Sequence, residues 1–199
     1  LGLGDEIKGV TFVPLEVTTD DASLIDGVYD YAVTDRYIYV LPVKEPRIVL
    51  FDRQGRFIRT LVKEGQGPGE FRGILPCIQV DERNDRLFLF SNNRVWEYTL
   101  EGEFIGQSTH EYSVIYMRHI GKDRFAAISF PFQPFNGGGF GLGLFSRKGD
   151  TIAIKNDFYS FLLPHEKSGF TTSIAPAYSD AQNSVLFKTG SNDTVFCIS

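Results

Sequence analysis

Short runs of apolar residues, separated by polar turns, extend along the whole chain. Residues 37–41, 87–90 and 185–187 are apolar at every position, which predicts β-strands that are buried on both faces. Residues 56–61 and 103–107 instead mix charged and apolar side chains, as expected of strands at the exposed edge of a sheet. The pattern therefore predicts sheets whose middle strands are buried and whose outer strands meet water.

A helix is expected in one place at most. Residues 157–165 have a weak helical pattern, and Pro164 would end such a helix within about two turns. The composition agrees, because the 199 residues include 20 Gly, 9 Pro, 18 Phe and 9 Tyr but one Met. Glycine, proline and aromatic residues favour short strands joined by tight turns. We predict an all-β fold.

A 47-residue repeat organises the chain. Gly55, Gly102 and Gly149 lie 47 positions apart, and each follows an aromatic strand end and a polar turn. This is the sequence of a β-hairpin whose glycine adopts a positive φ. Four strands in a period of about 40 to 50 residues are typical of a β-propeller blade. We therefore predict a single β-propeller domain over residues 1–199, made of four-stranded antiparallel blades. The blade units are expected at residues 20–62, 72–108, 112–155 and 170–199, with a closing strand at 8–18.

The segment after the first hairpin carries the motif of a known family, formed by Gly65, Gln66, Gly67, Pro68, Gly69, Glu70 and Phe71. In this position it resembles the inter-blade connection of six-bladed β-propellers related to NHL repeats. More narrowly, residues 12–198 resemble the uncharacterised six-bladed propeller lipoproteins of Bacteroides and related bacteria. The resemblance implies a structural motif with Phe71 between two sheets. A phosphate-binding loop is the alternative interpretation, but the Lys-Ser/Thr pair and the helix start that such a loop needs are missing.

The resemblance also implies a compartment and an incomplete ring. It leads us to expect an exported protein in the periplasm or at the outer membrane or cell surface, with a lipid anchor upstream of this chain. Six blades of this length need roughly 280 residues, whereas 199 residues supply about four blades. The chain is therefore expected to be a fragment, a truncated reading frame or a closed four-bladed ring, with the first two favoured. Because an open ring exposes an apolar sheet face, an unclosed chain predicts further blades or self-association.

Charge and hydropathy exclude two classes of interaction. The chain has 25 acidic and 20 basic residues, a net charge of −5, so nucleic acid is not an expected partner. No apolar run approaches the roughly 18 residues of a membrane span, so no transmembrane segment is expected. Cys77 and Cys197 lie in separate apolar runs. Two buried thiols are the favoured interpretation, and a disulfide between them is the alternative.

Candidate binding residues fall in the third unit. Tyr112, Tyr116 and Arg118 are expected on its first strand, which lines the central channel of a propeller, where such folds commonly bind ligands. Phe132 and Phe135 lie in a loop rich in glycine and amide side chains, where aromatic rings can stack on a sugar or a peptide. For these two phenylalanines, packing into the core is the alternative.

No catalytic or metal-binding set is recognisable. The sequence has no GxSxG motif, no CxxC pair and no second His or Cys at metal-ligand spacing from His110 or His165. We therefore assign no catalytic residue, metal ligand or cofactor, and predict a non-catalytic, exported propeller module that binds a glycan or a protein. The alternative is an NHL-like or sugar-processing propeller enzyme with a divalent metal in its channel. A sensory or scaffolding domain of a larger complex is a third hypothesis.

Overall fold

The computed structural model describes residues 10–72, 77–112, 114, 116–128, 142–155, 175–179, 184–188 and 195–198. These residues form β-strands and one short 3-10 helix, η2 (Glu82–Asn84). The predicted all-β fold is therefore confirmed. The helix predicted at residues 157–165 lies outside the described residues.

The strands form antiparallel sheets in chain order. The first sheet contains β1 (Val28–Val33), β2 (Tyr37–Pro42), β3 (Arg47–Asp52) and β4 (Phe57–Lys63). The second sheet contains β5 (Cys77–Asp81), β6 (Arg86–Ser91), β7 (Arg94–Tyr98) and β8 (Phe104–Thr109). The third sheet contains β9 (Tyr116–His119), β10 (Arg124–Ile128), β11 (Leu142–Ser146) and β12 (Thr151–Lys155). A further sheet pairs β13 (Ala175–Ser179), β14 (Ser184–Lys188) and β15 (Val195–Ile198).

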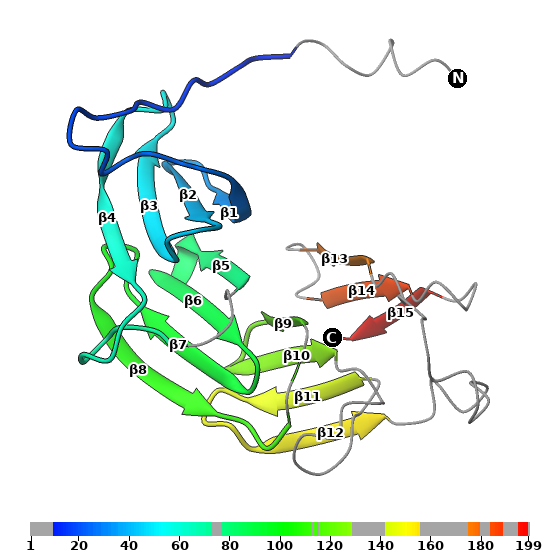
Figure 1. The fold of residues 1–199 in the computed structure, drawn as a ribbon. Helices are drawn as coiled ribbons and strands as arrows, with labels where there is room; N and C mark the ends of the chain where they lie inside the picture. The colour runs from blue at the N-terminus through cyan, green and yellow to red at the C-terminus, as the bar shows by residue number, and fades with distance from the viewer. Residues whose placement is uncertain are drawn as a thin grey trace, which may run out of the picture.

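The first three sheets follow one another along an arc (Figure 1). Their first strands, β1, β5 and β9, contact one another in turn and line the inner side of the arc. Their last strands, β4, β8 and β12, form the outer edges. Among the described residues, the sheets do not close into a ring (Figure 1).

The middle strands of the second sheet are buried because they pack against a neighbouring sheet on each face. In β6, Leu87 and Leu89 join the apolar cluster that the second sheet shares with the first. Phe88 and Phe90, which alternate with them, join the cluster shared with the third sheet, where the ring of Phe125 meets both edge-on. The continuous apolar run at residues 87–90 is therefore explained by two cores that share one strand.

The hairpin glycines adopt the backbone conformation that the repeat predicts. Gly55, Gly102 and Gly149 have φ values of 82°, 89° and 104°. A Cβ on Gly55 would strike the carbonyl oxygen of Pro14, and a Cβ on Gly149 would strike that of Thr109 at the end of β8, whereas a Cβ on Gly102 would lie tightly against Leu61. Each turn therefore needs glycine both for its own geometry and for its contact with the preceding element.

The segment from Gly65 to Phe71 connects the first two sheets. Phe71 is fully buried and meets the Trp96 ring edge-on, with centroids 6.4 Å apart. Within the loop, the Gly67 N–H donates to the Glu70 carboxylate at 2.8 Å. A loop amide that a phosphate would need is thus bonded to the loop's own carboxylate, which argues against the phosphate-binding alternative.

His110 is buried where the second and third sheets meet. It is 1% exposed, and its ring lies edge-on to Phe125 and Phe145. Burial in this aromatic environment lowers the pKa of His110 to about 4. In the folded protein the ring therefore stays neutral until the pH falls to about 4. In the unfolded chain, where the histidine pKa is near 6.5, the ring takes up a proton at a higher pH.

Replacing Gly149 with alanine should destabilise the protein by about 2 kcal/mol, because alanine resists a positive φ and its Cβ would strike Thr109. Chemical denaturation measures the loss. Gly106→Ala is the matched control, because a Cβ at Gly106 meets no atom within 4 Å; its stability should stay unchanged or rise by up to about 1 kcal/mol, since glycine inside a strand is unfavourable. Equal losses in both variants would contradict this account of the turn.

The stability of the wild-type protein should fall as the pH drops from about 6.5 to about 4, because only the unfolded chain protonates His110 in this window. The loss from this residue is about 3 kcal/mol. His110→Phe, which keeps a ring among the aromatic neighbours, should remove this part of the acid sensitivity. Denaturant titrations across the pH window compare the two proteins, and parallel curves would refute the assignment.

Candidate functional site

A groove of about 410 Å³ runs along the inner strands of the first three sheets. It is formed by the three strands that contact one another at the centre of the arc. Its lining comprises Tyr29, Asp30 and Tyr31 of β1, Cys77, Ile78 and Gln79 of β5, and Tyr116, Met117 and Arg118 of β9. The groove therefore joins residues from sheets far apart in the sequence.

Strand β1 presents two tyrosines around a carboxylate. Tyr31 is 64% exposed and Tyr29 is also exposed. Asp30 turns toward β5 and accepts the Ile78 N–H at 2.7 Å. Burial raises the pKa of Asp30 above its usual range, although this N–H bond, a second from Tyr31 and the charge of Arg118 act in the opposite direction. The carboxylate is thus held between two strands at the base of the groove.

Strand β9 supplies two of the residues that the sequence singled out. Tyr116 and Arg118 are half-buried and lie on one face, whereas Met117 and His119 are buried on the other. An Arg118 Nη1–H donates to the Tyr116 hydroxyl at 3.5 Å. The two residues therefore face the groove together, as the alternation of side chains along a strand requires.

Of the other three predicted binding residues, Tyr112 lies among the described residues and is not part of the groove lining. Tyr112 precedes β9 and packs against Phe145, with ring centroids 6.3 Å apart, so its expected place on the same strand as Tyr116 is wrong. Phe132 and Phe135 lie outside the described residues. Tyr29, Asp30 and Tyr31 were not predicted as binding residues from the sequence, although the repeat places them on the first strand of the first unit, equivalent to β9.

Both cysteines carry free thiols in the structure. Cys77 is half-buried beside the groove, and burial raises the pKa of its thiol to about 11. Cys197 is exposed. The expectation of two buried thiols is therefore wrong for Cys197.

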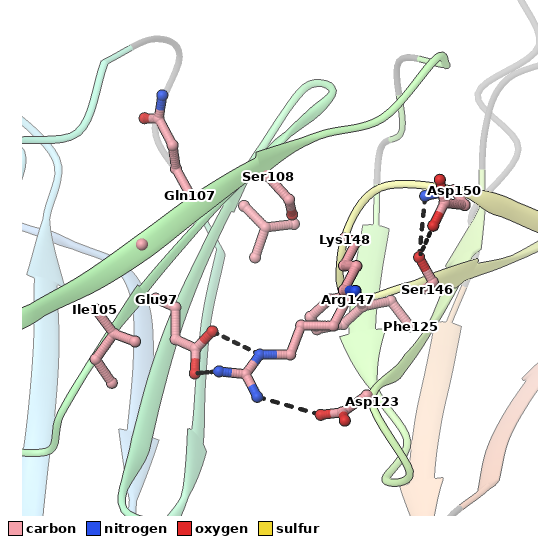
Figure 2. A pocket seen from close by; sticks show the side chains of 12 residues that line it. Glu97, Ile105, Gln107, Ser108, Asp123, Phe125, Ser146, Arg147, Lys148 and Asp150 are labelled. Atoms are coloured by element: carbon pink, nitrogen blue, oxygen red, sulfur yellow. Dashed lines mark hydrogen bonds and ion pairs between the residues drawn. The ribbon is translucent and has the colours of Figure 1, made fainter.

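A second pocket, of about 550 Å³, lies between the second and third sheets (Figure 2). Strands β7 and β8 form one side, and β10 with the β11–β12 turn forms the other. The lining residues are Val95, Glu97, Ile105, Gly106, Gln107, Ser108, Asp123, Phe125, Ser146, Arg147, Lys148 and Asp150.

An ion-pair network crosses this second pocket. Glu97 is only 7% exposed, and its carboxylate accepts the Arg86 Nε–H at 2.7 Å and a two-pronged contact from Arg147. The remaining Arg147 Nη1 donates to Asp123 at 3.2 Å. Figure 2 shows Arg147 extending from the third sheet to Glu97 on the second. The network therefore ties the two sheets together through Glu97 and Arg147.

His119 has a packing role beside a third, polar hollow of about 700 Å³. Its ring stacks on Phe88 at 5.0 Å, and its backbone exchanges two hydrogen bonds with the Gln79 side chain, at 2.6 and 2.9 Å. Burial lowers the pKa of His119, although Asp81 opposes this effect. Among the described residues, no group of three His, Cys, Asp or Glu side chains could hold a metal ion. The metal-dependent enzyme therefore stays a prediction.

Comparison with known proteins gives a family and a fold. The model of a family described as "Domain of unknown function (DUF4934)" matches residues 1–199. No curated protein matches the chain, whereas 29 chains of solved structures do. One of them is a "putative exported protein" from Bacteroides fragilis NCTC 9343, with 19% sequence identity and a TM-score of 0.71 over 93% of this chain. This chain spans about half of that structure, 51% of its length. The described part of the chain contains no helix that would span a membrane.

Replacing Glu97 with alanine should destabilise the protein by about 2 kcal/mol, because two arginines lose their shared, buried carboxylate. Glu101→Ala is the matched control, since its ion pair with Arg59 is exposed and should contribute no more than about 0.5 kcal/mol. Urea denaturation measures both values. Similar losses for the two variants would show that the network does not join the sheets.

Proposed function

Because this chain belongs to the DUF4934 family, whose description names no activity, we propose a function from the inner groove itself. The chain is part of an exported, non-catalytic β-propeller that binds a ligand along its inner strands. The ligand is a glycan or a protein segment, and the composition of the groove favours a glycan.

The propeller architecture is supported by the regular sequence of sheets. Three four-stranded antiparallel sheets follow one another with their first strands in contact, and the turn glycines recur every 47 residues. The similar solved structure is about twice as long as this chain, which agrees with a six-bladed ring to which this chain contributes part. Export is supported by the description of that structure. A lipid anchor and a periplasmic or cell-surface location belong to the same proposal.

One observation carries the glycan assignment: three tyrosines, an arginine and a carboxylate line the same groove. The faces of tyrosine rings pack well against the apolar faces of sugar rings. Arg118 can donate hydrogen bonds to sugar oxygens, and Asp30 can accept them from hydroxyl groups. Rigid strands hold these groups in place, which lowers the entropic cost of binding.

Titration calorimetry with cello-, xylo-, manno- and malto-oligosaccharides tests the proposal directly. The wild-type protein should bind at least one of these series. Tyr31→Ala should weaken binding about five- to tenfold through loss of one stacking ring. The single variant Arg118→Gln should weaken binding more than Tyr31→Ala does.

Phe12→Ala is the matched control, because Phe12 is an exposed aromatic residue outside the groove. This variant should bind like the wild type. Failure of the folded wild-type protein to bind any of these series would refute the glycan assignment, and undiminished binding by Tyr31→Ala would refute the groove.

A further inference from the structure

The pocket between the second and third sheets arises from a change within the repeat. The pocket lies at the junction of the second and third sheets. Because the sequence repeats every 47 residues, this junction can be compared with the junction of the first and second sheets, and the strand register supports the comparison. Arg59 pairs with Leu50 in the first sheet, and Gly106 pairs with Glu97 in the second. Each of these pairs is one step from the aromatic end of its strand. The two junctions can therefore be compared residue by residue.

Apolar side chains and one arginine occupy the equivalent positions of the junction between the first and second sheets. Leu50 and Leu100 belong to one buried cluster, and Leu61 packs against it. Arg59 extends from β4 to the turn of the next sheet, where its Nη2 donates to the Glu101 carbonyl oxygen at 2.8 Å and to its carboxylate at 2.7 Å. Apolar contacts and one bridging side chain occupy this junction.

The next junction replaces every one of these contacts. The residues 47 positions after Leu50, Arg59, Leu61, Leu100 and Glu101 are, in the same order, Glu97, Gly106, Ser108, Arg147 and Lys148. Apolar pairs thus become the Glu97–Arg147 ion pair, and the bridging arginine becomes a glycine. All five replacements line the second pocket, so equivalent positions carry apolar contacts at one junction and a polar cavity at the next.

The structure gives Gly106 no conformational reason to be glycine. Its φ is not among the positive values, and an added Cβ would meet no atom within 4 Å. Glycine inside a strand is unfavourable for stability and often marks a place where a ligand approaches closely. The effect of Gly106 here is to keep the pocket open.

The polar groups that remain in the pocket have unused bonding capacity. Lys148 is exposed and has no ion-pair partner among the described residues. Asp150 accepts the Ser146 hydroxyl through Oδ2 at 2.9 Å, and Asp123 accepts Arg147 through Oδ1, so each carboxylate keeps a second oxygen. A cation and hydroxyl-binding carboxylates thus surround one cavity.

We propose that this pocket is a second binding site, for an acidic saccharide such as a uronate. Lys148 binds the sugar carboxylate, while Asp123, Asp150 and Ser108 bind its hydroxyl groups. A simple anion would use Lys148 alone and be repelled by the two carboxylates, whereas a sugar acid uses both kinds of group. A volume of about 550 Å³ accommodates a ligand of one or two rings. The site is independent of the inner groove.

Titration calorimetry with the dimer of galacturonate and with the neutral dimer of galactose tests this assignment. The wild-type protein should bind the acidic dimer at least about tenfold more tightly than the neutral one. Lys148→Gln should abolish that preference. Lys44→Gln, which removes a lysine from the first sheet, should retain it. Equal affinity of the wild type for both sugars, or no binding of the acidic one, would overturn the proposal.

A double variant separates loss of binding from loss of folding. Gly106→Arg with Lys148→Glu recreates at this junction the pair that Arg59 and Glu101 form at the previous one. The protein should unfold at the wild-type temperature or above it, yet bind no acidic dimer, because the arginine occupies the pocket. Retained binding in this folded variant would overturn the proposal.

A groove variant distinguishes the two sites. Arg118→Gln should weaken glycan binding in the inner groove but keep the Lys148-dependent preference for the acidic dimer, because Arg118 lies in the groove and not in this pocket. If Arg118→Gln abolished binding of the acidic dimer and the pocket variants did not, the acidic sugar would belong to the groove and the second site would be refuted. If neutral glycans failed to bind the groove, the proposed function would be refuted, but the test of the acidic-saccharide site in this pocket would still stand.

Discussion

Face-to-face burial of successive sheets is the interaction on which the rest of the structure depends. A strand such as β6 has apolar side chains on both faces, so its sheet is stable only when a neighbour covers each side. Leu87 and Leu89 face the first sheet, and Phe88 and Phe90 face the third. The described part of the protein is therefore held together by contacts between successive sheets, and its pockets lie where neighbouring sheets meet at the surface.

The turn glycines set how closely two successive sheets can approach each other. Gly102 and Gly149 have positive φ values, and their missing side chains leave room for Leu61 and Thr109 of the preceding sheets. Because each of these two glycines lies against the last strand of the preceding sheet, the backbone frame is similar at the two junctions. Differences in chemistry then arise from side chains alone, which is how a repeated scaffold carries distinct sites. The change from Arg59 to Gly106 is the clearest case.

Part of the candidate site was accessible from sequence and part was not. The alternation of Tyr116 and Arg118 with Met117 and His119 follows from the two-residue period of a strand. The displacement of Tyr112 does not, because the start of β9 depends on how the preceding segment packs against Phe145. The pairing of Glu97 with Arg147 was likewise hidden, since the two residues lie 50 positions apart and meet only when two sheets stack.

The sequence by itself determined the all-β class, the hairpin turns and the buried middle strands, because these features depend on local backbone preference and on side-chain periodicity. A turn glycine or a buried strand can be predicted from a few neighbouring residues. Tertiary structure alone decided which strands line the inner groove and which sheet junction is hollow. Those outcomes depend on contacts between sheets. The environment of Gly106 or Asp30 is set by residues distant in the chain, so it cannot be predicted from the local sequence.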